Sequence, residues 1–152
     1  KSSRWQNIFS EGWRARNESE KVRMTGGEMD KIFKLNKGDI IYADLGHHSD
    51  SSVQSGKRPC VVVSCDTDNN INGNPIVNVC PCTTKYEKKK RRTHVLLRED
   101  DVEGYLMKAS LILVEQLVPV DKKMIVGKTG RIISRDVMDR IDKAIQYRFA
   151  LI

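Results

Sequence analysis

The sequence predicts a mainly β fold with helices: a small, strongly curved barrel of the SH3-like kind, with a C-terminal helix and an N-terminal helical extension. Five short runs of strand-forming residues follow one another between polar loops, and a single helical pattern comes after the last of them. A separate helical pattern near the start of the chain predicts the extension. We therefore expect an extension over residues 1–35 and a barrel domain over residues 36–152.

The extension is predicted to contain an amphipathic helix over residues 3–22. Apolar residues recur there at helical spacing within a charged segment, and Thr25-Gly26-Gly27 ends the pattern. These apolar residues are Trp5, Ile8, Phe9 and Trp13. The segment carries both tryptophans of the chain, so its apolar face has to cover another surface. We favour the chain's own barrel, while a second copy of the chain or an external partner remains open.

The strands are predicted from apolar runs that turn-forming residues separate. They cover residues 39–45, 60–65, 75–83, 93–98 and 110–118. A polar loop that carries His47 and His48 joins the first strand to the second. Short strands in this number, followed by one helix, are typical of a small curved barrel.

The closing helix has the clearest pattern in the chain. Its apolar residues follow the spacing i, i+4, i+7, i+8 and i+12, and Ser134 stands where an N-cap is expected. These residues are Val137, Ile141, Ala144, Ile145 and Phe149. The spacing places them on one face of a helix.

The charge balance is strongly basic. Lysine and arginine outnumber aspartate and glutamate by 27 to 20, which gives a formal net charge of +7 and a pI near 9.3. This balance suits a phosphate backbone or an acidic protein partner, and charge alone does not choose between them. No apolar run approaches the roughly 18 residues that a bilayer-spanning helix needs, and no signal-peptide pattern is present. We expect a soluble, cytoplasmic protein.

The four cysteines, at positions 60, 65, 80 and 82, lie in or at the ends of predicted strands. In a chain without a secretory signal such positions favour reduced, buried thiols over disulfides. A zinc site would prefer paired Cys-x-x-Cys spacings, which this chain lacks. We expect buried free thiols and neither a metal nor a cofactor.

Two polar residues stand at the ends of neighbouring predicted strands. Arg58 precedes the apolar run Cys60-Val61-Val62-Val63, and Thr83 closes the next strand along the chain. A guanidinium and a hydroxyl provide little covalent chemistry, but they can hold a phosphate and stabilise charge on its oxygens. In RNA the ribose itself supplies the nucleophile. The pair therefore indicates RNA as the substrate.

Five blocks of sequence precede the closing helix in a fixed order. They are Lys37-Gly38-Asp39-Ile40, Gln54-Ser55-Gly56-Lys57-Arg58-Pro59, Pro81-Cys82-Thr83-Thr84, Thr93-His94-Val95 and Leu113-Val114-Glu115-Gln116-Leu117. In this order and spacing the chain resembles the MazF/PemK family of toxins over about residues 36–152. The resemblance implies a CcdB/PemK-like fold. It also implies a homodimeric mRNA interferase that cuts single-stranded RNA at short sequences without a metal, and that a cognate antitoxin neutralises.

The resemblance further implies that Arg58 and Thr83 are catalytic, with a 2′,3′-cyclic phosphate and a 5′-hydroxyl as products. Arginine side chains stay protonated in proteins and make poor general bases, so we assign Arg58 to stabilising charge on the phosphate. The identity of the base stays open. His47 or His48 can supply it if their loop closes over RNA, because imidazole titrates near neutral pH; two solvated loop histidines are the alternative.

Further residues are candidates for binding RNA. The run over residues 85–92 carries six positive charges directly after Thr84, and Tyr86 offers a face on which a base can stack. A solvated hairpin loop, or a site for an acidic antitoxin tail, would produce the same run. The residues expected to contact RNA are Gln54, Ser55, Gly56, Lys57, Thr84, Lys85 and Gln116.

One position departs from the family pattern. Many members carry an acidic residue where this chain has Val53, so the loop lacks a carboxylate there. Two other functions therefore stay open. One is a non-enzymatic toxin of the same fold that poisons a protein target such as gyrase, and the other is a catalytically inactive barrel that only binds RNA.

Overall fold

The computed structural model describes residues 34–85, 91–106 and 108–152. The helix predicted over residues 3–22, almost all of the N-terminal extension and Tyr86 lie outside the described residues. The division into an extension over residues 1–35 and a barrel domain over residues 36–152 stays a prediction.

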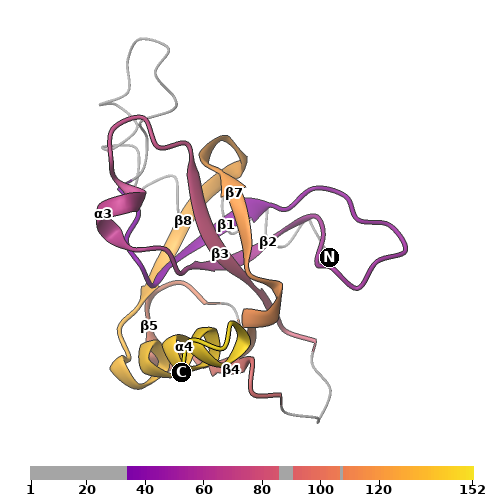
Figure 1. Ribbon diagram of the computed structural model, residues 1–152, viewed down its shortest axis with the longest axis vertical. Coiled ribbons are helices and arrows are strands. Elements are labelled where there is room, and N and C mark those ends of the chain that lie inside the picture. Colours follow the sequence, from indigo (N-terminus) through magenta and orange to yellow (C-terminus); the bar gives the residue numbers. More distant parts are fainter. Residues whose placement is uncertain (1–33, 86–90, 107) are drawn as a thin grey trace.

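The described residues form one curled antiparallel sheet with a helix packed beside it (Figure 1). The strands are β1 Asp39–Asp44, β2 Lys57–Val62, β3 Ile76–Thr83, β4 His94–Leu97, β5 Val102–Gly104, β6 Ser110–Leu113, β7 Val118–Asp121 and β8 Ile125–Ile132. They pair in the order β4-β6-β3-β2-β1-β8-β5, and β7 pairs with β3 off this path. The prediction of a mainly β, strongly curved fold is confirmed.

The strand predicted over residues 110–118 is in fact two strands. After β6 the chain makes a 3-10 turn, η4 Val114–Gln116, and then continues as β7. β6 pairs with the C-terminal end of β3, whereas β7 pairs with its N-terminal half. The prediction of one strand was wrong because the turn contains no glycine or proline and strand-forming residues stand on both sides of Glu115-Gln116.

β5 and β8 were not predicted, and glycines explain why. β8 contains two glycines and β5 ends on a third, and glycine is a poor strand former. A Cβ on Gly104 would lie 2.6 Å from the Thr129 carbonyl oxygen, and one on Gly130 would lie 2.6 Å from the Glu103 carbonyl oxygen. The glycines that weakened the strand pattern in the sequence are therefore the residues that allow the backbones of β5 and β8 to approach each other.

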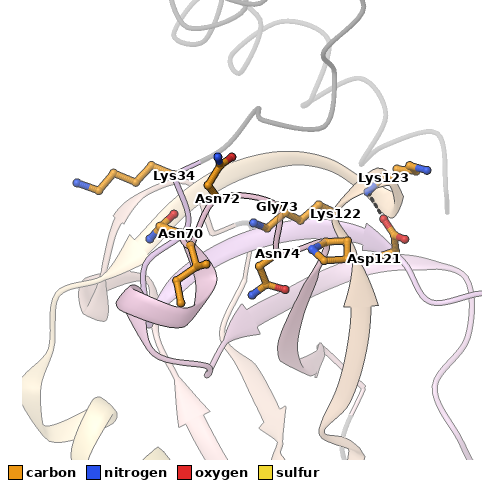
Figure 2. Close-up of a pocket in the computed structure, with 10 residues that line it drawn as sticks. Lys34, Asn70, Asn72, Gly73, Asn74, Asp121, Lys122 and Lys123 are labelled. Carbon is orange, nitrogen blue, oxygen red and sulfur yellow. Dashed lines mark hydrogen bonds between the residues drawn. The ribbon is translucent and has the colours of Figure 1, made fainter.

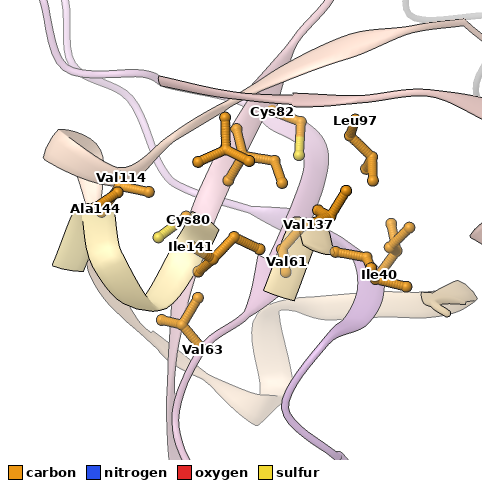
Figure 3. Close-up of a cluster of buried hydrophobic side chains, with 13 residues drawn as sticks. Ile40, Val61, Val63, Cys80, Cys82, Leu97, Val114, Val137, Ile141 and Ala144 are labelled. Carbon is orange, nitrogen blue, oxygen red and sulfur yellow. The ribbon is translucent and has the colours of Figure 1, made fainter. Parts of the chain in front are cut away.

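The curled sheet has an apolar core on each face. Val61, Cys80 and Ile112 belong to the first core, which Figure 3 shows beneath the C-terminal helix. Cys60 and Val62 belong to the second core, together with the other members Leu35, Ile41, Ala43, Val77, Val79, Val120 and Ile125. Successive residues of β2 thus alternate between the two cores, as the two-residue period of a strand requires.

The C-terminal helix, α4 Arg135–Arg148, covers the first core. Ser134 Oγ accepts a hydrogen bond from the Val137 amide at 3.3 Å, so the predicted N-cap is confirmed. Val137, Ile141 and Ala144 are buried, as the spacing predicted. Phe149 departs from the prediction, since the helix ends at Arg148 and the phenylalanine at its C-cap is 53% exposed.

All four cysteines are free thiols, and Cys60, Cys80 and Cys82 are buried as predicted. Cys65 is exposed, because β2 ends at Val62 and Cys65 is the N-cap of a short helix, α3 Asp66–Asn69. Two 3-10 turns complete the elements, η3 Glu99–Asp101 and η5 Lys122–Met124. Within the described part of the chain, no helix combines the length and apolar character needed to cross a membrane.

Candidate active site

Arg58 and Thr83 lie on neighbouring strands at the same end of the sheet. In the β2–β3 pair, Cys60 is opposite Pro81 and Val61 is opposite Cys80. Continuing this antiparallel register places Arg58 opposite Thr83, just beyond the last paired residues. Residues that stand opposite each other point to the same face of a sheet, which here is the face of the second core. Both side chains are half-buried, and each lies at the end of an apolar surface.

The loop between β1 and β2 holds Arg58 in place. Arg58 Nε donates a hydrogen bond to the Ser55 carbonyl oxygen at 3.1 Å. This contact uses Nε and not the two terminal nitrogens that would bind two oxygens of one phosphate. The hydrogen bond therefore fixes the guanidinium through Nε and leaves the two terminal nitrogens, which could bind a phosphate, outside this contact.

The groups around Arg58 are neutral at physiological pH. Burial raises the pKa of the Cys60 thiol to about 12, although the Arg58 charge acts in the opposite direction. Burial likewise raises the pKa of Tyr42 and of Cys82, against the same opposing charge. A neutral, low-dielectric surrounding leaves the positive charge of Arg58 uncompensated by these three groups, so it acts strongly on an incoming anion.

The hydroxyl of Thr83 is held by its own turn. Thr83 Oγ1 donates to the Lys85 carbonyl oxygen at 3.0 Å and accepts from the Lys85 amide at 3.1 Å. The oxygen keeps a second lone pair, but donation to a phosphate requires the hydroxyl to release the carbonyl of Lys85. Thr84 is half-buried and Lys85 is exposed.

A long-range contact places the β1–β2 loop against the turn between β6 and β7. The Gln54 amide donates to Gln116 Oε1 at 3.0 Å, and Gln116 Nε2 donates to the Ser52 carbonyl oxygen at 3.0 Å. The base of the loop is closed by two backbone hydrogen bonds, in which Gly46 and Gly56 take part with positive φ. Among the predicted RNA contacts, Gln116 therefore touches the loop backbone through both ends of its amide.

The loop histidines are not brought to Arg58. His47 and His48 are both exposed, and His48 Nε2 donates to the Leu45 carbonyl oxygen at 3.0 Å. Ser55 is half-buried, and Gly56 and Lys57 are exposed. The predicted site residues therefore separate into two groups: Arg58, Thr83, Gln54, Ser55 and Gln116 are connected by register or hydrogen bonds, whereas the histidines stand apart.

Glu115 is a residue of this region that the sequence did not single out. His94 Nε2 donates to Glu115 Oε1 at 2.8 Å, and both side chains are mostly buried. Burial opposes the charge of Glu115, but the hydrogen bond from His94 helps to bring the pKa of this carboxyl below its usual value. His94 belongs to the block Thr93-His94-Val95, and its side chain packs with a carboxylate from η4 as its hydrogen-bond partner.

A separate cleft of about 600 Å³ lies at the other end of β3 (Figure 2). It is lined by Lys34, the segment Asn70–Pro75 and Asp121–Lys123, and contains none of the predicted site residues. The N-terminal end of β3 is about 23 Å along the strand from Thr83. Over the residues that the structure describes, no three His, Cys, Asp or Glu side chains form a group suited to a metal ion.

Comparison with known proteins gives a consistent result. Residues 36–149 match the family model of the PemK-like, MazF-like toxin of type II toxin-antitoxin system. Endoribonuclease EndoA of Bacillus subtilis (strain 168) is 34% identical over 119 residues, which cover 78% of this chain and 97% of the relative.

Solved structures of similar fold agree with this match. An endoribonuclease from mycobacterial species, in complex with its cognate antitoxin, aligns with a TM-score of 0.61 at 18% identity and covers 78% of this chain and 97% of its own. MazF from Deinococcus radiodurans aligns with a TM-score of 0.61 at 17% identity and covers 78% and 98%. At these identities the likeness concerns the fold.

Proposed function

Because this chain belongs to the PemK-like, MazF-like toxin family of type II toxin–antitoxin systems, we propose that it is an endoribonuclease toxin that cuts single-stranded mRNA at specific short sequences. The proposal is supported by the register of β2 and β3, in which Cys60 is paired with Pro81; extending this register by two residues brings Arg58 opposite Thr83 at one end of the sheet. The strongly basic charge of the chain favours a polyanionic substrate.

The proposed reaction is an attack within the RNA strand. The ribose 2′-oxygen bonds to the adjacent phosphorus and loses its proton, while the bond from phosphorus to the 5′-oxygen breaks and that oxygen gains a proton. The products are a 2′,3′-cyclic phosphate and a 5′-hydroxyl. Negative charge builds on the two non-bridging oxygens, where the terminal nitrogens of Arg58 and the hydroxyl of Thr83 stabilise it. No step of this scheme requires a metal.

The base that takes the 2′-hydroxyl proton is a separate proposal. Either loop histidine reaches the phosphate only if the loop folds inward, and His48 must then release the Leu45 carbonyl. Substituting His47 and His48 by glutamine, one at a time, and recording cleavage rate against pH tests this. Loss of the low-pH limb, in which the rate falls as the base becomes protonated, identifies the base in that variant, and unchanged profiles in both remove the histidines from the mechanism.

Partners and location follow from the family. We propose that a cognate antitoxin neutralises this protein in the cytoplasm and that the active form is a homodimer. A mass of one chain in solution, measured by light scattering at concentrations where RNA is cut, would contradict the dimer.

The direct test is incubation of the purified protein with a long natural RNA in EDTA, followed by mapping of the fragment ends. Discrete cuts that leave cyclic phosphates and 5′-hydroxyls support the proposal. Intact RNA in the presence of folded protein would contradict it and favour a protein poison or an inactive RNA-binding barrel, with Val53 as the first position to restore to an acid.

A further inference from the structure

A second strongly basic surface lies at the free edge of the sheet. β4 is the last strand on one side of the described sheet, and α4 packs beside it (Figure 1). The space at this edge is a cleft of about 580 Å³, which we call the α4 cleft. Its charged and aromatic lining residues are Arg91, Arg92, His94, Arg140, Lys143 and Tyr147. Among the described residues, no aspartate or glutamate lines it; its other lining residues are Val95, Leu96, Ala144 and Ile152.

The cations of the α4 cleft come from two distant segments of the chain. Arg91 and Arg92 precede β4, whereas Arg140 and Lys143 lie one turn apart on α4. Arg140 pairs with Asp136 at 2.9 Å, but both side chains are more than half exposed, and Arg91 lies 3.9 Å from Glu115. Exposed ion pairs contribute little free energy. An anion with several charges can therefore compete for these side chains.

An aromatic face stands among these charges. The Arg92 guanidinium lies 5.2 Å from the ring centre of Tyr147, which is 53% exposed. A planar cation above an exposed ring offers two flat surfaces on which a nucleobase can stack. This combination of flat and charged groups is characteristic of sites for single-stranded nucleic acid.

The sheet connects the α4 cleft to Thr83. Thr83 is paired with Leu111 of β6, and Leu111 is paired with Leu96 of β4, which lines the cleft. These three side chains therefore point to one face of the sheet. Two strand spacings separate Thr83 from Leu96, which is about 10 Å. Because α4 covers the opposite face of the sheet, a strand of RNA held at Thr83 reaches the cleft by passing around the free edge of β4.

We propose that the α4 cleft is a second binding site for the RNA strand, where Arg92, Arg140 and Lys143 hold phosphates beyond the scissile one and a base stacks at Tyr147. This inference rests on the proposed function, in which RNA is the substrate. An acidic protein segment would also satisfy the positive charges. RNA is favoured because its bases can stack on the exposed ring beside Arg92 and because Leu96, at the edge of the cleft, is only two strands from Thr83.

The test uses the double variant Arg140→Ala/Lys143→Ala and a matched control, Lys123→Ala/Arg135→Ala. The control removes the same charge from exposed side chains outside the cleft. Binding is measured with uncleavable 2′-O-methyl RNA of about 4 and about 12 nucleotides, lengths that span the range of such sites. The cleft variant should bind the longer RNA about tenfold more weakly. Its slope of log affinity against log salt should fall by about 1.4, which is two single-strand phosphate contacts.

Stacking is tested separately at Tyr147. Tyr147→Phe keeps the ring and should bind the longer RNA like the parent, whereas Tyr147→Ser should bind it several-fold more weakly. The shorter RNA should bind equally to all variants, because it does not reach the cleft. Thermal unfolding of each variant checks that these exposed substitutions leave the fold intact.

Three results would overturn the proposal: unchanged binding of the longer RNA by the cleft variant, an equal loss in the control variant, or a loss of binding to polyglutamate with RNA binding intact. The last result would assign the cleft to an acidic protein. Failure of the proposed function gives a different result. In that case the parent protein binds the longer 2′-O-methyl RNA through the cleft but cuts no natural RNA, which supports the RNA-binding site and contradicts the nuclease activity.

Discussion

Gln116 binds the β1–β2 loop at two points: its Oε1 accepts a hydrogen bond from the Gln54 backbone amide, and its Nε2 donates to the carbonyl of Ser52, each at 3.0 Å. The two contacts flank Val53, which is 49% exposed. They join the loop that precedes Arg58 to η4, the turn at which β3 changes partners from β7 to β6. The prediction that Gln116 binds RNA stays a prediction, and its two hydrogen bonds also favour a role in positioning the loop.

Substituting Gln116 by alanine should loosen the loop without unfolding the sheet. Two hydrogen bonds of about 1 kcal/mol each are lost, but the loop is exposed, so the global stability should fall by less than about 2 kcal/mol. Hydrogen exchange should accelerate at Gln54, and the cleavage rate should fall through kcat. Gln146→Ala on α4 is the matched control. Equal protection of the Gln54 amide in both variants would remove the positioning role.

The cleavage rate should depend on the hydroxyl group of residue 83 and not on the size of its side chain. Thr83→Val keeps the shape but removes the group that bonds Lys85 and is proposed to contact the phosphate. Its cleavage rate should fall by about 10²-fold, the range found when one donor to a developing oxyanion is removed. Thr83→Ser should retain most activity. A fully active valine variant, with cuts at unchanged positions, would exclude a catalytic hydroxyl.

Acid should weaken the fold through Glu115. The folded-state pKa of this carboxyl lies below its usual value, so ionised Glu115 stabilises the fold at pH above the unfolded value of about 4.3 and loses this effect as the pH falls through its folded value. Glu115→Gln keeps an acceptor for His94 but no charge. It should cost about 1 kcal/mol at neutral pH, and the difference from the parent should shrink in acid.

The control for Glu115 is Glu103→Gln, which removes a carboxylate from an exposed pair with Arg131. Its effect on the free energy of unfolding should be within about 0.5 kcal/mol across the same pH range. Urea unfolding between pH 3 and pH 7 gives both comparisons. A difference between Glu115→Gln and the parent that grows in acid would contradict the assigned direction.

The cysteines should react in two classes. Cys65 is exposed, whereas burial raises the pKa of Cys60 and Cys80 to about 12 and that of Cys82 well above its ordinary value. A thiol reagent at pH 8 should modify one cysteine rapidly and the other three only on unfolding, because the thiolate is the reactive form. Cys65→Ser should abolish the rapid phase. Rapid modification of a second thiol in that variant would show that a core strand opens.

The sequence was most informative where pattern and packing agree. The period of α4 and the serine at its N-terminus were enough to predict the helix, and apolar runs located β1 to β4. η4 was missed because no glycine or proline marks it between two strand-forming segments, and β8 was missed because its glycines serve a close approach of two backbones. Both features depend on partners that lie far away in the sequence.

The candidate site shows the same division. The order of the strands was enough to predict that Arg58 and Thr83 lie at the same end of the sheet, because Arg58 is near the start of β2 and Thr83 is the last residue of β3. The Gln116–Gln54 hydrogen bond and the Glu115–His94 pair could not be predicted from the sequence. They join residues 62 and 21 positions apart, and they depend on η4, a turn that no local pattern marks. The His48 contact with Leu45 likewise depends on a loop conformation set by glycines with positive φ.

The most direct test compares the parent, Arg58→Ala and the control Arg135→Ala on an RNA with one mapped cleavage site in EDTA. Both variants lose one arginine, but Arg58 lies in β2, two residues beyond the pair Cys60–Pro81, whereas Arg135 lies at the start of α4. The account predicts that the parent and the control leave 2′,3′-cyclic phosphate and 5′-hydroxyl ends at equal rates, and that Arg58→Ala is slower by at least about 10²-fold with its fold intact. Cleavage by Arg58→Ala at the parent's rate would contradict it.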